Sequence, residues 1–428
     1  MRVIVAVLIA GLLLAGWLAV DRRGNIETRA VIHYAYWIGV PTEKLANETI
    51  VAEFERRNPD IKVEVHHHPW AAYFTKLYVG LASDTAPDVF RMSYGYLPDY
   101  AAHGALLPLD DLIAADDSFS LDELFPGPFE SCHWDNHQLM MPVDYPAYIV
   151  FYNKELFDLA GVRYPRDDWT HEEFLQTALR LRDGFRRAGR VDHWAVTGLY
   201  FPSWVHEFGG QILDRERMVC TIDSPESIHA IQFLHDLVHA YDVAVSDARA
   251  VQRVADLFAA GRVAMSFGES YMIERYRREC SFDWDITYRP KGVRRTGKAL
   301  AVGLGIWSRT RHREAAWRLV KFFVSPFAQE VYAKTGALTP IRKSVAHSSL
   351  FLPEAGRKPA NKAILTQMED TYLANWMCLQ WGQLRLELYH EILPAITNPA
   401  TPEQIAEACR RAAASANRVL DEAYRREQ

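Results

Sequence analysis

The apolar and polar positions of the chain follow strand and helix periods in turn from about residue 30 onward. An apolar run over 31–37 predicts a strand, and Pro41 opens a segment whose apolar residues recur at helical spacing as far as Phe54. Apolar and polar residues then alternate over 61–65, which predicts a second strand. This strand–helix–strand unit indicates an α/β fold.

The most apolar internal stretch, over 141–161, is expected to organise the rest of the chain. Two prolines keep its start extended, because proline lacks an N–H group and biases the preceding residue away from helix. The YIVFY run over 148–152 is β-branched and aromatic throughout, which predicts a strand buried on both faces. Asn153 is expected to cap a short helix that ends at Gly161. We expect this segment to cross between two lobes.

Length and composition also favour two lobes. The chain has 428 residues, which is more than one hydrophobic core usually serves, and its 49% apolar content is ample for two. The net charge of −6 is spread along the chain, so nucleic acid is not expected as a partner. The five cysteines show no metal-ligand spacing; at most two disulfides could form, and their pairing cannot be deduced from the sequence.

The N-terminus has the pattern of a targeting element. Arg2 precedes an uninterrupted apolar run over 3–20, long for a signal-peptide core and within the range of about 17–25 residues that spans a bilayer. Trp17 stands where a lipoprotein would carry its lipidated cysteine, so lipidation is not expected. The absence of a clear cleavage site favours an uncleaved anchor over a secreted product. Residues 1–24 are therefore predicted to be a signal peptide or an N-terminal membrane anchor. Either would direct the chain out of the cytoplasm.

Several motifs carry a resemblance to a known family. The sequence YNKELF followed by AGV, over 152–162, resembles the hinge-crossing segment of extracytoplasmic solute-binding proteins, family 1, which serve ABC sugar importers and include maltose-binding-protein-like members. Further motifs resemble the same family: APDVF at 86–90, GALLPLDDL at 104–112, LFAAGRVAM at 257–265, LAVGLGIW at 300–307 and GALTPIRKSV at 336–345. Together they extend over nearly the whole chain after residue 30.

The resemblance implies a fold, a function and partners. The expected fold class is α/β, a two-lobed periplasmic-binding-protein-like fold of type II with a ligand cleft between the lobes and a hinge of crossing segments. Lobe 1 is expected from 30–143 plus 291–340, and lobe 2 from 144–290 plus 341–428. The implied function is binding of a sugar or sugar-like small molecule outside the cytoplasm and its delivery to ABC transporter permease subunits. No cofactor is implied.

Candidate ligand-binding residues come from strand ends, loops and the resemblance. Ligands of open α/β sheets lie beyond the carboxyl ends of strands, where Trp37 and Tyr94 are expected, although core packing is the alternative for both rings. Asp144 stands at the expected crossing, where a carboxylate must be satisfied by solvent, ligand or a donor. Trp204 is expected on a loop interrupted by Gly and Pro, where its ring could stack on a sugar. The full candidate set is Trp37, Asp84, Tyr94, Asp144, Tyr145, Trp204, Gly268, Glu269, Ser270, Gly303, Arg342 and Trp381.

Several of these candidates depend on the resemblance or on their local context. Gly268, Glu269 and Ser270 are expected to open a helix whose N–H groups face the cleft, but Ser270 stands where oligosaccharide-binding members often have Trp, so the identity of the sugar stays open. Arg342, in the expected third crossing, could bind hydroxyls or a carboxylate, or it could be a solvated surface charge.

Other chemistries were weighed against ligand binding. The run His66, His67 and His68 is not predicted to bind a metal, because consecutive strand residues point to opposite faces of a sheet. No nucleophile elbow, phosphate-binding loop or zinc-protease motif occurs. The enzyme alternative is an exported glycoside hydrolase that uses Asp144 and Glu269, and a third alternative is an anchored ligand sensor without transport.

Overall fold

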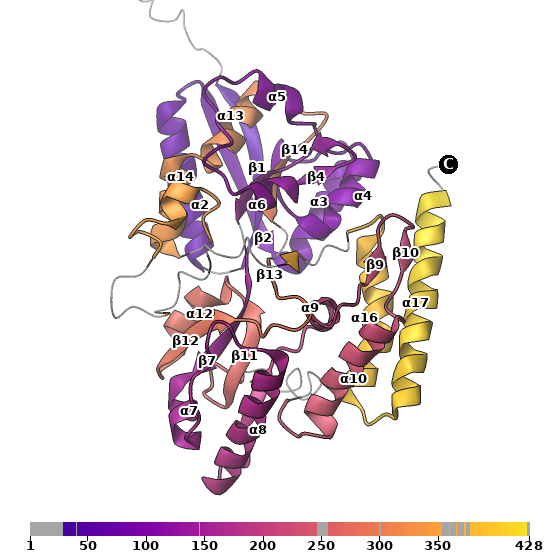
Figure 1. The fold of residues 1–428 in the computed structure, drawn as a ribbon. Helices are drawn as coiled ribbons and strands as arrows, with labels where there is room; N and C mark the ends of the chain where they lie inside the picture. The colour runs from indigo at the N-terminus through magenta and orange to yellow at the C-terminus, as the bar shows by residue number, and fades with distance from the viewer. Residues whose placement is uncertain are drawn as a thin grey trace, which may run out of the picture.

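The structure, a computed structural model, has two lobes that each contain a β-sheet (Figure 1). It describes residues 29–39, 41–144, 146–245, 256–298, 301–336, 338–352, 359, 365, 372–373 and 377–425. The predicted N-terminal anchor and Tyr145 lie outside these residues. Among the described residues, no helix combines the length and the apolar character needed to cross a bilayer.

The sheet of the first lobe has five strands in the order β2-β1-β3-β14-β6. Its strands are β1 (Ala30–Ile38), β2 (Ile61–Pro69), β3 (Val89–Ser93), β6 (Met141–Asp144) and β14 (Val302–Ile306). β1 pairs in parallel with β2 and β3, whereas β14 runs antiparallel between β3 and β6. The predicted strand–helix–strand start of the α/β fold is therefore confirmed.

Helices cover both faces of this sheet. One face, which carries Tyr34, packs against α2 (Pro41–Arg57), α13 (Arg313–Phe323) and α14 (Pro326–Thr335). The opposite face, which carries Trp37, packs against α3 (Trp70–Ala82) and α4 (Leu97–Ala102). Short elements complete the lobe: η1 (Tyr94–Tyr96), α5 (Asp110–Ala114), α6 (Pro126–Glu130), β4 (His133–Trp134), β5 (His137–Gln138) and α15 (Lys343–Ala346).

The sheet of the second lobe has four strands in the order β12-β7-β11-β8. They are β7 (Tyr148–Asn153), β8 (Trp194–Thr197), β11 (Val263–Glu269) and β12 (Trp284–Tyr288). β7 lies between β12 and β11, and Ile149 to Asn153 are buried, so the prediction of a strand buried on both faces is confirmed.

Helices also cover the second sheet, and the last two stand at its side (Figure 1). They are α7 (Lys154–Ala160), α8 (His171–Arg187), α9 (Phe201–Glu207), α10 (Pro225–His239), α12 (Met272–Glu279), α16 (Trp381–Thr397) and α17 (Pro402–Arg425). Two short ladders accompany them: β9 (Leu213–Asp214) with β10 (Val219–Cys220), and β13 (Thr296–Lys298) with β15 (Tyr372–Leu373).

The local signals after the central strand form the caps that the sequence predicts. The Leu156 N–H donates to the side chain of Asn153 at 3.1 Å, and Gly161 ends α7 with a φ of 68°, a conformation that glycine adopts without a steric penalty. Thr170 and Glu173 form a reciprocal capping box at the start of α8.

The predicted loop around Trp204 is wrong, because residues 201–207 form α9. Pro202 lies in the first helical turn, where its missing N–H breaks no helical hydrogen bond. The helix turns Trp204 into the core of the second lobe, where its exposed fraction is 0% and its ring lies 5.4 Å from that of Phe174. The Arg289 guanidinium lies 5.2 Å from the same ring. Trp204 is therefore a core residue.

The chain crosses between the sheets where the sequence predicts. Asp144 ends a strand of the first sheet and Tyr148 begins a strand of the second. The division into lobes at 340 and 341 stays a prediction. However, the Phe125 N–H donates to the Ile341 carbonyl at 3.0 Å and the Lys343 N–H to the Glu123 carbonyl at 2.7 Å, which favours a later boundary.

Four of the five cysteines are not paired in disulfides. Cys132, Cys220, Cys378 and Cys409 are buried free thiols. Because these four are unpaired, neither of the two possible disulfides forms among them.

Candidate functional site

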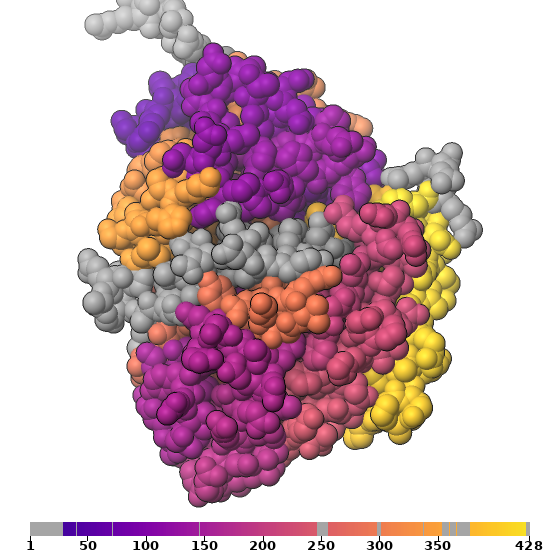
Figure 2. Space-filling view, in the orientation of Figure 1, coloured from indigo at the N-terminus to yellow at the C-terminus, as the bar shows by residue number. Residues whose placement is uncertain are grey.

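A cavity of about 450 Å³ lies between the lobes, at the carboxyl ends of β1, β3, β6 and β11. In the space-filling view the first lobe stands above the second (Figure 2). Side chains of both lobes line the cavity. The lining comprises Trp37, Gly39, Glu43, Trp70, Arg91, Ser93, Tyr94, Asp144, Pro146, Tyr148, Tyr200, Glu269, Tyr271, Val302, Leu338, Trp381, Arg385 and Tyr389. The volume falls within the range of small-molecule sites.

A network of charged side chains lines the part of the cavity that the first lobe contributes. Arg91 Nη1 on β3 donates to Glu43 Oε1 at 2.9 Å, and its Nη2 lies 3.9 Å from Asp144 Oδ2. Glu43 stands in the first turn of α2 and also accepts the Gly39 N–H at 2.5 Å. Burial lowers the pKa of Arg91, but the Glu43 and Asp144 carboxylates outweigh it, so the net pKa is raised and the guanidinium stays charged.

Trp37 extends this network with an aromatic surface. The Arg91 guanidinium carbon lies 4.3 Å from the centroid of the Trp37 ring, which is a cation–π distance. Trp70 packs edge-on against the same ring at 4.9 Å. The indole of Trp37 is thereby held in one orientation at the end of β1.

Asp144 ties the crossing to a segment far along the chain. The Thr339 N–H donates to Asp144 Oδ1 at 3.0 Å, which satisfies one oxygen of this buried carboxylate. The expectation that a carboxylate here must be satisfied by a donor is confirmed by this contact and by the proximity of Arg91.

Glu269 is the carboxyl group that the second lobe contributes to the cavity. It ends β11, opposite Tyr148 on β7. Burial raises the pKa of the Glu269 carboxyl from 4.5 to about 7, and the Asp144 carboxylate contributes to the increase. Near neutral pH this group can therefore either donate or accept a hydrogen bond.

Tyrosine and tryptophan rings of both lobes surround the carboxylates. The Tyr148 and Tyr200 rings stack with centroids 5.6 Å apart, and Tyr148 shares hydrogen bonds with the hydroxyls of Tyr94 and Tyr200. Trp381 from the second lobe meets Tyr94 from the first at 5.9 Å. Arg385, one turn along α16, lies 5.5 Å from the Trp381 ring.

The comparison with known families decides the kind of protein. The profile described as bacterial extracellular solute-binding protein matches residues 41–330. The chain belongs to this family.

Relatives of this solute-binding protein are distant in sequence and close in fold. The structure of an ABC substrate-binding protein from Listeria monocytogenes in complex with cycloalternan is 26% identical, covers 92% of this chain and 99% of its own, and has a TM-score of 0.80. A putative binding protein of Brucella abortus is 21% identical over 72% of this chain and 75% of its own. An arabinooligosaccharide-binding protein of Halalkalibacterium halodurans is 26% identical over 46% of this chain and 44% of its own.

The structure brings five of the predicted site residues of this solute-binding protein together. They are Trp37, Tyr94, Asp144, Glu269 and Trp381, which all line the cavity. Tyr145 lies outside the described residues. Whether the five contact a ligand stays a prediction.

Three predicted residues lie elsewhere. Trp204 is in the core of the second lobe. Asp84 is exposed on the loop after α3 and pairs with Arg309. This loop leads into the amino end of β3, whereas the cavity lies at the carboxyl end of that strand. Arg342 turns toward the first lobe, where its Nε donates to the Val324 carbonyl at 3.3 Å and its Nη1 lies 3.7 Å from Glu123. Arg342 therefore does not line the cavity, and because its side chain is only 14% exposed it is not a solvated surface charge either.

The small predicted residues, Gly268, Ser270 and Gly303, make packing and hydrogen-bond contacts close to the cavity. Ser270 Oγ accepts the Ala147 N–H at 3.1 Å and lies 3.2 Å from Thr339 Oγ1, so it joins β11 to the crossing. A Cβ atom at Gly303 would lie 2.9 Å from the Met141 carbonyl, and one at Gly268 would lie 2.7 Å from the Met272 sulfur. Both glycines permit close packing and neither belongs to the lining.

Several lining residues were missed from the sequence. Arg91 had a usable signal, because a charged residue inside the otherwise apolar VFRMS strand must find a partner. Arg385 and Tyr389 also had one, since they follow Trp381 at four-residue steps and share its helical face. Glu43 and Tyr271 had no distinguishing local pattern.

Proposed function

We propose that this solute-binding protein binds a neutral sugar, an oligosaccharide or a smaller one, in the cavity between its lobes and delivers it to the permease of an ABC importer. The observation that carries the proposal is the composition of the lining. Aromatic rings from both lobes can stack on the C–H faces of a sugar, while carboxylates and guanidinium groups among them can bind its hydroxyls. The sugars named for the Listeria and Halalkalibacterium relatives support the same ligand class.

The charges of the cavity favour a neutral ligand over a phosphorylated one. Glu43, Asp144 and Glu269 face Arg91 and Arg385, so the carboxylates balance or exceed the cations. Arg91 is already committed to Glu43. A phosphate group would therefore meet repulsion from the remaining carboxylates, whereas sugar hydroxyls can both donate and accept.

Two buried donors support binding of oxygen atoms in the cavity. Among the described residues, the Nε atoms of Arg91 and Arg385 are buried and have no hydrogen-bond partner. A buried donor left unpaired costs about 1–3 kcal/mol, which a ligand hydroxyl would recover once a shift of the two side chains brings these atoms to the cavity surface.

Binding and transport are linked through closure of the lobes. Because each lobe contributes part of the lining, a ligand that contacts both parts favours the arrangement in which they are close. The permease would recognise that arrangement from the extracytoplasmic side of the membrane. The apolar run over 3–20 is proposed to keep the protein at that membrane.

Calorimetry with a sugar panel tests the proposal. The panel contains cycloalternan, arabino-oligosaccharides, malto-oligosaccharides and glycerol phosphate, each titrated into the full-length protein. We expect a neutral sugar to bind, and Trp381→Ala to weaken it by about 1–3 kcal/mol, the scale of stacking on an aromatic ring. Trp204→Ala is the matched control, expected to lower the melting temperature and to leave affinity unchanged. Equal affinity for wild type and Trp381→Ala would refute the placement of the site.

The same samples test the enzyme alternative. Asp144 and Glu269 both line the cavity, which is the arrangement that a glycosidase would need. A solute-binding protein is expected to return each bound sugar intact in an assay for released reducing ends. Release that stops in Glu269→Gln would favour hydrolysis instead.

A further inference from the structure

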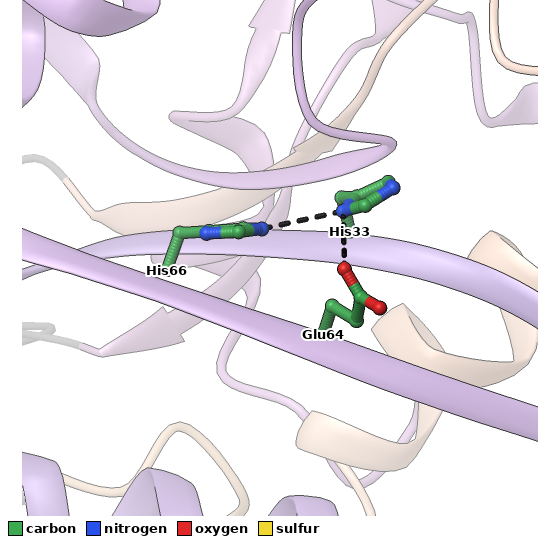
Figure 3. A group of neighbouring side chains, drawn as sticks. All are labelled: His33, Glu64 and His66. Atoms are coloured by element: carbon green, nitrogen blue, oxygen red, sulfur yellow. Dashed lines mark hydrogen bonds and ion pairs between the residues drawn. The ribbon is translucent and has the colours of Figure 1, made fainter.

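The sheet face that carries Trp37 is exposed near the start of β1, where β1 and β2 carry three side chains with metal-binding atoms. β1 and β2 pair in parallel with His33 directly beside Glu64. His66 follows Glu64 by two residues on the same strand, so it points to the same face. Figure 3 shows the two imidazole rings and the carboxylate converging above the sheet.

The distances between these atoms match a metal coordination shell. His33 Nδ1 lies 3.2 Å from His66 Nε2 and 3.4 Å from Glu64 Oε2, and all three atoms lie within 4.8 Å of one another. Zinc binds His nitrogen and carboxylate oxygen at about 2.0–2.2 Å, so neighbouring ligands of a tetrahedral ion lie about 3.3–3.5 Å apart. The edge between His33 and Glu64, at 3.4 Å, has this length, and the edge between His33 and His66, at 3.2 Å, is slightly shorter.

Hydrogen bonding alone satisfies the cluster poorly. His33 Nδ1 faces both His66 Nε2 and Glu64 Oε2, and a single proton on Nδ1 can be donated to only one of them at full strength. A cation at the centre would interact with the lone pairs of all three atoms at once.

The two lysines described near this cluster both lie against other side chains. Lys62, the next residue on the same face, donates to Glu55 Oε2 at 3.1 Å, and Lys76 lies at His68, with the two nitrogens 3.4 Å apart. The side chains of His33 and Glu64 are 47% and 53% exposed, so an ion held there would keep access to water. Among the described residues this is the one group of three or more His, Cys, Asp or Glu side chains whose ligand atoms come together.

We propose that His33, Glu64 and His66 bind a divalent transition-metal ion of the Zn²⁺ type, with water in the remaining coordination position. Two imidazoles and one carboxylate are a ligand set that suits such ions. The site is separate from the sugar cavity, because His33 precedes Trp37 by four strand residues, about 13 Å at the usual rise.

The proposal differs from binding by the histidine run. His67 points to the opposite face, where its ring lies 5.9 Å from that of Tyr36. The sequence argument against the run as a whole holds for that reason, but it could not include His33, which β1 brings to the site from 33 residues away.

Titration of Zn²⁺ into the full-length protein, prepared without a polyhistidine tag, tests the site. We expect one ion per chain by calorimetry and a rise of the melting temperature with Zn²⁺ concentration. His33→Ala is expected to weaken binding at least about tenfold, since loss even of an outer-sphere partner typically costs 10–100-fold. His67→Ala is the matched control within the run and is expected to bind as the wild type does.

Three outcomes would overturn the proposal: no Zn²⁺ binding by the wild type, unchanged affinity in His33→Ala, or equal losses in His33→Ala and His67→Ala. Unchanged affinity in His33→Ala would assign binding to the histidine run alone, and equal losses in the two variants would show that the loss does not depend on which face of the strand carries the imidazole. Glu64→Gln provides a second variant that keeps the shape of the exposed side chain, and it too is expected to weaken Zn²⁺ at least about tenfold. Sugar affinity, measured on each variant, should stay constant and reports on the integrity of the fold.

Discussion

Glu269→Gln should change how the stability of the protein depends on pH. Burial, with a contribution from Asp144, raises the pKa of the Glu269 carboxyl from 4.5 to about 7. The folded state therefore holds a proton that the unfolded state releases, and the resulting stabilisation is fully present below about pH 4.5 and is lost as the pH rises through about 7. At about 1.4 kcal/mol per pKa unit, the increase in the pKa of Glu269 from 4.5 to about 7 corresponds to about 3 kcal/mol of stability. The Glu269 side chain is only partly buried, so solvent screening makes this figure an upper limit.

Urea unfolding at half-unit steps from pH 4.5 to 8 measures the effect. The free energy of unfolding of Glu269→Gln relative to the wild type should be constant near pH 4.5 and rise by up to about 3 kcal/mol by pH 8, because glutamine does not ionise. Gly382→Ala, where a Cβ atom would meet nothing within 4 Å, is the control, because it changes no ionisable group. Its profile should therefore stay parallel to that of the wild type. Parallel profiles for Glu269→Gln and the wild type would refute the raised pKa.

Two further predictions concern the contact between the two lobes and the core of the second lobe. A Cβ atom at Gly95 would lie 2.5 Å from the Trp381 ring, so Gly95→Ala should separate the lobes there and lower sugar affinity at least tenfold by calorimetry, about 1.4 kcal/mol. Gly382→Ala is the control, because a Cβ atom there would meet nothing within 4 Å, and equal affinities of Gly95→Ala and the wild type would contradict the contact. Arg289 Nε donates to Glu207 Oε1 at 2.6 Å, and both side chains are buried. Arg289→Ala should therefore lower the free energy of unfolding in urea by about 3–5 kcal/mol, because it removes the cation that pairs with a buried carboxylate. A decrease below about 1 kcal/mol would show that the Glu207 carboxylate finds other partners.

The features predicted correctly from the sequence were those encoded over a few neighbouring residues. β7, the Asn153 cap and the crossing after Asp144 each depend on local periodicity or on a capping residue, and all three formed as expected. Burial was harder to predict, because Trp204 has the same local sequence whether α9 turns it outward or inward. The Arg91–Glu43 pair joins residues 48 apart in the chain, and no spacing rule connects them. A search for charged residues inside apolar strands would have found Arg91.

Asp144 connects the proton, the ligand and the arrangement of the lobes. Its Oδ1 atom accepts the Thr339 N–H, its Oδ2 atom faces Arg91 of the first lobe, and its charge contributes to the raised pKa of Glu269 in the second. A sugar hydroxyl that donates to Asp144 would disperse that charge and so favour ionisation of Glu269. Ligand binding would then release a proton near neutral pH, and, by reciprocity, a higher pH would strengthen binding. The lobes contribute one carboxyl group each to this pair, so any motion that separates them also weakens their electrostatic coupling.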